Sequence, residues 1–309
     1  MSNIERVGIL GAGVIGSSWT ALFLAAGHEV DVYEPGENGE QKVRDYIEMA
    51  WPTLTSLGMT KLGNTENVRF HSSVASAVEN VQFVQESIPE QIDLKHALFA
   101  EIESKLAPEA IVASSASGLM VSEMQKGWKN PARFILGHPF NPPHLIPLVE
   151  LLGNEQTADG VLASAEAFYQ KAGKVTIRVN REVPAHVANR LQAALWREAI
   201  SLVQNGVASV EDVDKAVWAG PGLRWGAMGP HMSFHLGAGP GGLGEFCNRY
   251  RDSFHRWWQD LDEVELSEEL ATSLFEGVVE EGGDKDVAEL ARKRDELIVA
   301  MLKGTTPLR

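Results

Sequence analysis

A glycine-rich turn between a predicted strand and a predicted helix is the feature that most constrains the fold of this chain. Residues 6–10 indicate a buried strand, which runs directly into the sequence Gly-Ala-Gly-Val-Ile-Gly over 11–16. Gly11 permits the tight turn, Gly13 lets a pyrophosphate approach the backbone, and Gly16 lets the helix pack closely on the strand. The amino end of that helix then faces the phosphates. We therefore expect a dinucleotide-binding unit.

The strand that follows ends in an acidic residue, which bears on the choice of dinucleotide. The helix over 17–26 ends at Gly27, and the strand over 29–33 leads to Glu34. A carboxylate at this point binds the adenosine ribose hydroxyls of NAD and repels the 2′-phosphate of NADP. Only an arginine folding back, such as Arg44, would offset that repulsion. We expect NAD as the cofactor, bound by Gly11, Gly13, Val14, Ile15, Gly16 and Glu34.

Strands and helices alternate through the first half of the chain, and helices alone follow. Further short strands are predicted at 67–70, 82–85, 110–113, 133–136, 147–152 and 174–179. Helices are predicted at 187–204, 211–218 with Ser209 as cap, 266–281 and 286–302, with a frayed end over 304–309. This order predicts an α/β fold, with a Rossmann-type doubly wound sheet followed by a smaller all-α C-terminal domain. We expect the NAD-binding domain over 1–181 and the helical domain over 182–309.

A histidine and a glutamate in apolar surroundings form the second informative pattern. The predicted strand over 133–136 ends just before the sequence Gly-His-Pro-Phe-Asn-Pro, so His138 is expected beyond its carboxyl end, where open α/β sheets bind ligands. Glu150 lies between two aliphatic residues, where an ionised carboxylate needs a partner. Bonded to one nitrogen of His138, it would leave the other nitrogen free as a general base. A structural histidine and an edge-strand glutamate are the alternative.

Composition and charge exclude several classes of protein. The net charge of −15 argues against nucleic acid or an anionic membrane as partner, and the longest apolar run, around 21–26, is too short to cross a bilayer. The first strand leaves no room for a signal peptide before it, and a single cysteine, Cys247, fits a reducing compartment. Metal-ligand spacing is missing from the sequence. We expect a cytoplasmic protein without a metal.

Further motifs occur in a fixed order along the chain. They are Glu86-Ser87-Ile88-Pro89-Glu90 with Lys95, Ser114-Ser115-Ala116-Ser117, Val187-Ala188-Asn189-Arg190-Leu191 and Gly222-Leu223-Arg224-Trp225. Together with the glycine turn and the His138 to Glu150 stretch, they resemble the L-3-hydroxyacyl-CoA dehydrogenase superfamily. Within it they resemble the branch of λ-crystallin, L-gulonate 3-dehydrogenase and L-carnitine dehydrogenase. The resemblance covers nearly the whole chain.

The resemblance implies the oxidation of a secondary alcohol. His138 would take the hydroxyl proton while a hydride passes from the same carbon to the nicotinamide, and Glu150 would orient and support the imidazolium. Ser117 and Asn189 would bind the reacting oxygen or its neighbours. Asn141 would shape the loop under the substrate.

Other residues carried over from the family also have plainer interpretations. Glu90 and Lys95 would lie along the nicotinamide half of NAD, but an acid and a solvated lysine are also common at a helix start. Ser117 is also compatible with a helix cap. Asn189, inside an apolar helix, is expected to be buried and therefore to need partners.

The charges of one segment and one arginine favour a free acid over a thioester as substrate. Residues 36–67 should hold the basic helical pair that a coenzyme A binder needs, yet they contain Lys42, Arg44 and Lys61 against Glu37, Glu40, Asp45, Glu48 and Glu66. Arg224 lies in a Gly/Pro-rich stretch, where the gulonate and carnitine enzymes also carry an arginine. Its guanidinium would hold a free carboxylate bidentately, unless it forms a structural salt bridge. A hydroxyacyl-CoA dehydrogenase and a non-catalytic, crystallin-like NAD-binding protein are the alternatives.

The identity of the acid is left open between gulonate-like and carnitine-like substrates. Phe140, Trp196 and Trp225 are available to cage a trimethylammonium group. His144 and His186 stand where carnitine-type enzymes are expected to have aromatic residues, and they would make the pocket more suitable for a hydroxylated acid.

The second domain is expected to mediate assembly. The family resemblance implies a homodimer through this domain, and the aromatic run over 254–258 is interpreted as core or subunit contact. Residues 237–244, with five glycines, are either a tight connection or a mobile lid.

Overall fold

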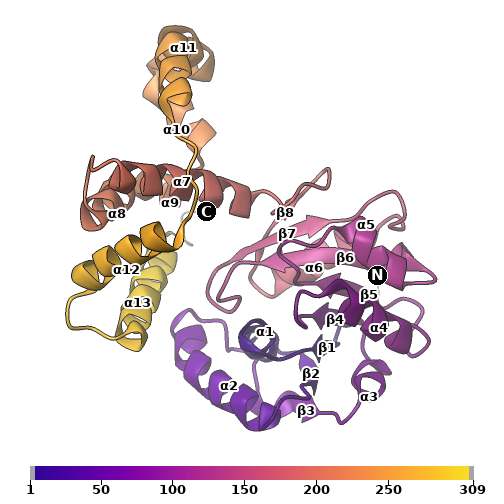
Figure 1. Ribbon diagram of the computed structural model, residues 1–309. Helices are drawn as coiled ribbons and strands as arrows, with labels where there is room; N and C mark the ends of the chain where they lie inside the picture. Colours follow the sequence, from indigo (N-terminus) through magenta and orange to yellow (C-terminus); the bar gives the residue numbers. More distant parts are fainter. Residues whose placement is uncertain (1–3, 306–309) are drawn as a thin grey trace. The chain divides into compact units, whose positions relative to one another are not determined.

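The structure is a computed structural model, and it describes residues 4–305 in two compact units. The units divide after Arg190, within one long helix (Figure 1). The expected domain boundary at residue 182 lies shortly before this division and stays a prediction. Within the described residues, no helix is both long and apolar enough to cross a membrane.

An eight-stranded sheet forms the centre of the first unit. Its strands are β1 (Arg6–Leu10), β2 (Glu29–Tyr33), β3 (Val68–Phe70), β4 (Phe83–Glu86), β5 (Ile111–Ser114), β6 (Phe134–Pro139), β7 (Leu148–Leu152) and β8 (Val175–Arg178). The spatial order is β3-β2-β1-β4-β5-β6-β7-β8, and all neighbours are parallel except β6 and β7. The predicted doubly wound fold is confirmed.

Helices cover both faces of the sheet and bury two apolar clusters against it. They are α1 (Val14–Ala25), α2 (Gly39–Ser56), α3 (Val74–Val78), α4 (Ile92–Ile102), α5 (Val121–Met124) and α6 (Val161–Lys171), with short 3₁₀ turns η1 (Thr65–Asn67), η2 (Gln125–Gly127) and η3 (Pro131–Arg133). The first cluster joins α1, α2 and α6 and includes Trp19 and Tyr169. The second joins α3, α4 and α5 and includes Phe99. Both faces of the strands are therefore apolar, as expected of a parallel sheet between two layers of helices.

Strand β6 departs from the sequence prediction. It was expected to end at Leu136 but continues to Pro139, so His138 lies inside the strand and not beyond it. The reason is the antiparallel partner β7, which extends the ladder and places His138 directly opposite Glu150. Because β8 pairs with the far side of β7, Glu150 is not on an edge strand, while the catalytic role of the pair stays a prediction.

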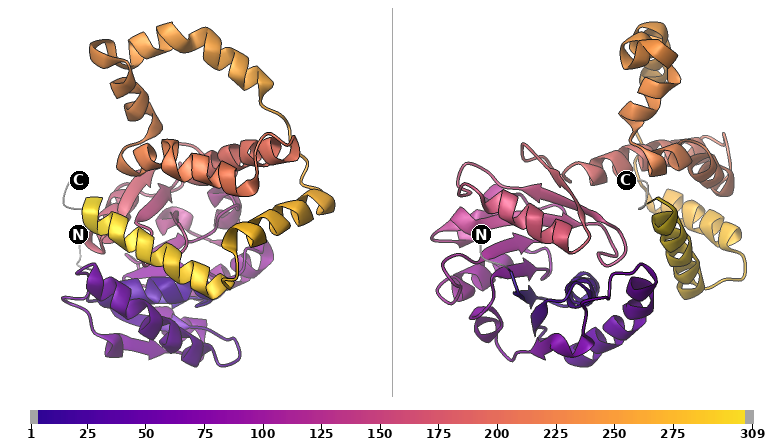
Figure 2. Two further views of the ribbon diagram at one scale, coloured as in Figure 1. Left: turned by 90° about the vertical axis from the view of Figure 1, so that its left-hand side faces the viewer. Right: turned by 180° about the vertical axis from the view of Figure 1, so that it is seen from behind.

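The regular elements from Ala188 to Thr305 are all helices, as predicted (Figure 2). They are α7 (Ala188–Gln204), α8 (Val210–Ala219), α9 (Pro221–Ala227), α10 (Pro230–Gly237), η4 (Gly239–Gly241), α11 (Gly242–Asp260), α12 (Glu268–Gly282) and α13 (Val287–Thr305). Ser209 caps α8 as expected, since its Oγ accepts a hydrogen bond from the amide of Asp212 at 3.1 Å. The expected fraying did not extend to residues 304 and 305, which are helical, and its remainder lies outside the described residues.

The glycine-rich segment over 237–244 forms a tight connection between α10 and α11. Gly239 and Gly242 have φ values of +67° and +58°, and a Cβ on Gly242 would come within 2.5 Å of the His235 ring. Helix α11 then packs its aromatic rings on α10, with Phe234 and Phe246 centroids 4.7 Å apart.

Candidate active site

The glycine turn leads into α1 with the geometry that a dinucleotide requires. Gly11 has a φ of +80°, and a Cβ on Gly16 would lie 2.0 Å from the carbonyl oxygen of Gly11. Gly13 has open space around the position of a Cβ, so its backbone is accessible from outside. Val14, in the first turn of α1, is 61% exposed. This accessible backbone at a helix amino end fits the pyrophosphate of NAD.

Glu34 lies at the end of β2, beside the glycine turn. Its Oε2 accepts a hydrogen bond from the amide of Ala12 at 2.6 Å, and its Oε1 accepts one from Gly36 at 2.8 Å. The carboxylate is therefore fixed next to the turn. Arg44 is engaged elsewhere, since it pairs with Glu40 at 2.8 Å and its guanidinium lies over the ring of Phe70.

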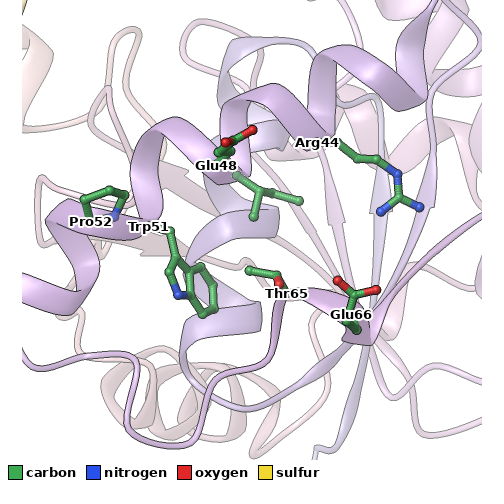
Figure 3. Close-up of a pocket in the computed structure, with 7 residues that line it drawn as sticks. Arg44, Glu48, Trp51, Pro52, Thr65 and Glu66 are labelled. Atoms are coloured by element: carbon green, nitrogen blue, oxygen red, sulfur yellow. The ribbon is translucent and has the colours of Figure 1, made fainter.

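A hollow between α2 and η1 lies in the segment where an acyl-CoA enzyme was expected to carry basic residues. It has a volume of about 400 Å³ and is lined by Arg44, Glu48, Trp51 and Glu66, among others (Figure 3). The lining therefore carries two carboxylates and one guanidinium, and that guanidinium pairs with Glu40. This charge balance is unfavourable for a polyphosphate.

His138 and Glu150 are joined by a short hydrogen bond in the middle of the β6–β7 ladder. Nδ1 of His138 lies 2.7 Å from Oε2 of Glu150, and the two residues are 5% and 0% exposed. A carboxylate has no proton to give, so Nδ1 is the donor. This fixes the tautomer and leaves Nε2 with a lone pair, as a general base requires.

The second oxygen of Glu150 is held by the start of α7. Oε1 accepts hydrogen bonds from the amides of Val187 and Ala188, both at 3.0 Å. Burial by itself raises the pKa of Glu150, but the hydrogen bonds from His138 and these two amides outweigh it and hold the pKa below its usual value. Glu150 is thus ionised and ready to balance an imidazolium.

Two rings flank His138. The Phe140 ring lies edge-on with its centroid 5.7 Å away, and the His186 ring lies 5.2 Å away. His186 is 1% exposed, and its Nδ1 has no hydrogen-bond partner among residues 4–305. Burial and the nearby His138 lower its pKa, so this ring is neutral. The ring of His144 contacts α1, since its Nδ1 is 2.9 Å from Oγ of Ser18.

Ser117 and Glu90 form a second polar pair, after strands β5 and β4. Oγ of Ser117 donates to Oε2 of Glu90 at 2.7 Å, and the amides of Gly118 and Leu119 bind the other carboxylate oxygen. Burial alone raises the pKa of Glu90, but these bonds outweigh it and lower the pKa. Ser117 does not cap a helix, since α5 begins at Val121 with Met120 as its N-cap.

Lys95 is not the solvated lysine that its position at a helix start suggests. It is 1% exposed, and its Nζ lies 2.5 Å from Oε1 of Glu86. The other oxygen of Glu86 accepts a hydrogen bond from Ser114 at 2.6 Å, so the group joins α4, β4 and β5. The contact of Lys95 with NAD stays a prediction.

The remaining predicted residues lie in different parts of the chain. Asn189 is half-buried in the first turn of α7, not buried as expected, and its side chain has no hydrogen bond within the described residues. Asn141 is exposed in the loop after β6. Arg224 is exposed on α9, in the second unit, and forms no ion pair within residues 4–305, so the structural salt bridge is not seen.

Sequence reasoning missed a buried network beneath His138. Nε2 of Gln85 donates to Oγ of Ser115 at 2.8 Å and to the carbonyl of Gly137 at 3.3 Å, while Tyr169 donates to Oε1 of Gln85 at 2.5 Å. The network ties β4, β5 and α6 to the residue just before His138. A glutamine within an apolar strand was the available signal, because a buried amide needs partners.

Comparisons with known proteins place this geometry in a family. Residues 6–183 match the NAD-binding domain of 3-hydroxyacyl-CoA dehydrogenase, and residues 186–278 match the C-terminal domain of the same enzyme. The chain belongs to this family. It is therefore an oxidoreductase that uses NAD and acts on a CH–OH group.

Similar proteins with full-length matches carry more specific names. L-carnitine dehydrogenase of Streptomyces coelicolor is 43% identical over 98% of this chain and 95% of its own length. L-carnitine dehydrogenase of Pseudomonas putida is 37% identical over 98% of this chain and 95% of its own. The solved structure of 5-formyl-3-hydroxy-2-methylpyridine 4-carboxylic acid 5-dehydrogenase, an NAD-dependent dismutase, has a TM-score of 0.84 at 26% identity, covering 98% of this chain and 99% of its own.

Proposed function

We propose that this protein oxidises the 3-hydroxyl group of a small free carboxylic acid to a 3-oxo acid, with L-carnitine as the first candidate substrate. The observation that carries the proposal is the buried pair of His138 and Glu150, with Nε2 of His138 available as a base. Earlier in the chain, the glycine turn over 11–16 and the carboxylate of Glu34 have a geometry that fits NAD.

The reaction needs one proton transfer to the protein. The hydroxyl proton of the substrate moves to Nε2 of His138, and the imidazolium that forms keeps its Nδ1–H bond to Glu150. The amides of Val187 and Ala188 keep Glu150 ionised throughout. NAD, when bound, supplies the nicotinamide ring that accepts the hydride. Ser117 and Asn189 bind the reacting oxygen or its neighbours, Glu90 and Lys95 contact the nicotinamide half, and Asn141 shapes the loop under the substrate.

The free acid is favoured over an acyl-CoA thioester by charge. Glu48 and Glu66 line the hollow beside α2. Arg224 is exposed and without an ion pair among the described residues, and it is the proposed anchor for the substrate carboxylate. The relatives compared above are named for free acids, carnitine and a pyridine carboxylic acid.

L-carnitine comes before L-gulonate because two of the three full-length relatives compared above are L-carnitine dehydrogenases, at 43% and 37% identity. The ring of Phe140 beside His138 offers an apolar wall near the reacting carbon. One observation favours gulonate as second candidate: the buried Nδ1 of His186, which has no hydrogen-bond partner among residues 4–305, suits a substrate that carries a further hydroxyl.

A spectrophotometric screen for NADH formation tests the proposal. L-carnitine, L-gulonate, 3-hydroxybutyrate and a 3-hydroxyacyl-CoA are compared, and we expect the highest kcat/KM with L-carnitine. His138→Gln serves as control and should abolish turnover without weakening NAD binding. A much higher kcat/KM for the acyl-CoA, or binding of NAD with no turnover of any substrate, would contradict the proposal.

The anchor role of Arg224 is tested in the same screen. Arg224→Met should raise KM for the preferred acid by about 10-fold or more, because a charge-assisted bidentate bond is lost. KM for NAD should stay unchanged. An unchanged KM for the acid removes Arg224 from the substrate site.

We also propose that the protein is a cytoplasmic homodimer that assembles through its helical domain. A single free cysteine, Cys247, suits a reducing compartment. The helical domain carries many large apolar side chains that are exposed in the single chain.

A further inference from the structure

The loop over 140–147 connects the two strands that carry the dyad: it follows β6, which holds His138, and leads into β7, which holds Glu150. The loop turns on itself, because the amides of Leu145 and Ile146 both bond to the carbonyl of Pro142. Beyond this turn, the loop is hydrogen-bonded to the residue before β8 and to α1, and it contacts α2 through the rings of His144 and Tyr46.

Lys174, immediately before β8, provides the first of these contacts. Its Nζ donates to the carbonyl oxygens of Pro143 at 2.6 Å and Ile146 at 2.5 Å. The residue is 5% exposed, and Nζ lies 5.1 Å from the centre of the Trp19 ring on α1. Burial lowers the pKa of Lys174 to about 7, but a neutral amine retains two N–H donors, so both bonds persist at alkaline pH.

Ser18, the residue before Trp19 on α1, provides the second contact with the loop. Its Oγ accepts a hydrogen bond from the amide of His144 at 2.8 Å and lies 2.9 Å from Nδ1 of the same residue. Ser18 is fully buried. The dyad loop is thus bound to the helix whose amino end forms the glycine turn.

We propose that Lys174 and Ser18 are positioning residues that hold the loop over 140–147, and through it His138, in register with the cofactor helix α1. Neither residue touches the reacting atoms. Their effect is on the distance between the base and the site of hydride transfer, and an error of about 1 Å in such a distance costs on the order of 100-fold in rate. The proposal rests on the proposed role of His138 as the base.

Kinetics of two variants test the proposal. Lys174→Met keeps the apolar stem against Trp19 and removes both donors, and Ser18→Ala removes the contact with His144. We expect kcat to fall about 10- to 100-fold in each variant, with KM for NAD nearly unchanged because the glycine turn is intact. Since hydride transfer becomes slower than product release, the primary deuterium isotope effect on kcat, measured with the substrate deuterated at C3, should rise. Lys171→Met, an exposed lysine on α6, is the matched control and should behave as wild type.

Hydrogen–deuterium exchange provides a readout that needs no substrate. In both variants the amides of His144, Leu145 and Ile146 should exchange at least about 10-fold faster, while β1 and β4 keep their protection. A wild-type kcat with an unchanged isotope effect overturns the proposal, and so does unchanged exchange in the loop. If wild type oxidises no free acid, the proposed function fails, and the exchange data still decide whether Lys174 and Ser18 hold the loop. If Lys174→Met does not fold, Ser18→Ala carries the test.

Discussion

At the scale of single residues, Glu150 is where the charges of the site are balanced. One of its oxygens binds Nδ1 of His138 and the other binds two amides at the start of α7. A carboxylate with no exposed surface is tolerated because every bond to it favours its charged form. The same hydrogen bonds keep the carboxylate charged, so that it can stabilise an imidazolium on His138.

Replacing Glu150 by Gln should separate its structural role, as a hydrogen-bond acceptor, from its stabilisation of the imidazolium by charge. The amide oxygen still accepts hydrogen bonds, so the helix start and the β6–β7 ladder are expected to persist. The negative charge that stabilises the imidazolium is lost, and kcat should fall by about 100-fold or more. Steady-state kinetics with NAD binding measured by fluorescence check this, and a loss of less than about three-fold would show that Glu150 is structural only.

The same variant gives a prediction about pH and stability. Because the folded-state pKa of Glu150 is lowered, the carboxylate stabilises the fold above its unfolded pKa of about 4.3, and this contribution is lost as pH falls through the folded value. Between pH 6 and pH 3 the free energy of unfolding of wild type should therefore fall more steeply than that of Glu150→Gln. Urea denaturation at several pH values measures both slopes, and parallel slopes would contradict the assigned pKa direction.

At the scale of elements, the strands were largely predictable and their pairing was not. Seven of the eight strands lie within one residue of the expected bounds because a buried strand needs an apolar run, which the sequence displays directly. The antiparallel pairing of β6 with β7 was hidden, since orientation depends on how the chain returns through the loop over 140–147. Lys174 was hidden for a related reason: its partners are backbone carbonyls about thirty residues away, and no side-chain pattern marks them.

The glycine turn is the element whose sequence requirement is most strict. In Gly16→Ala, the new Cβ would lie 2.0 Å from the carbonyl oxygen of Gly11, so α1 must move away from β1. We expect the Kd for NAD to rise about 10- to 100-fold, equivalent to roughly 1–3 kcal/mol of strain. Calorimetric titration measures the Kd. Gly244→Ala, where an added Cβ meets nothing within 4 Å, is the matched control, and equal Kd values for the two variants would contradict the packing argument.

At the scale of the whole molecule, the two units differ in how well they cover their apolar side chains. The first buries nearly all of its large apolar residues in the clusters on either face of the sheet. In the second, Trp218, Leu223 and Phe275 are 65%, 70% and 66% exposed. Helices α7, α8 and α12 also border an apolar hollow of about 340 Å³, lined by residues that include Trp196, Leu266 and Phe275. Exposure on this scale is unusual for a monomer and favours burial against a second copy.

The proposed homodimer gives the last prediction. Phe275→Glu places a charge on the apolar hollow and should convert a dimer into monomers at micromolar concentration, because an interface core does not tolerate an unpaired carboxylate. Size-exclusion chromatography with light scattering gives the mass of each species, and Glu276→Gln, on the next residue of α12, is the control that should remain dimeric. A wild type that is monomeric at all concentrations would contradict the dimer. A Phe275→Glu variant that stays dimeric would move the interface away from this hollow, to another part of the exposed apolar surface.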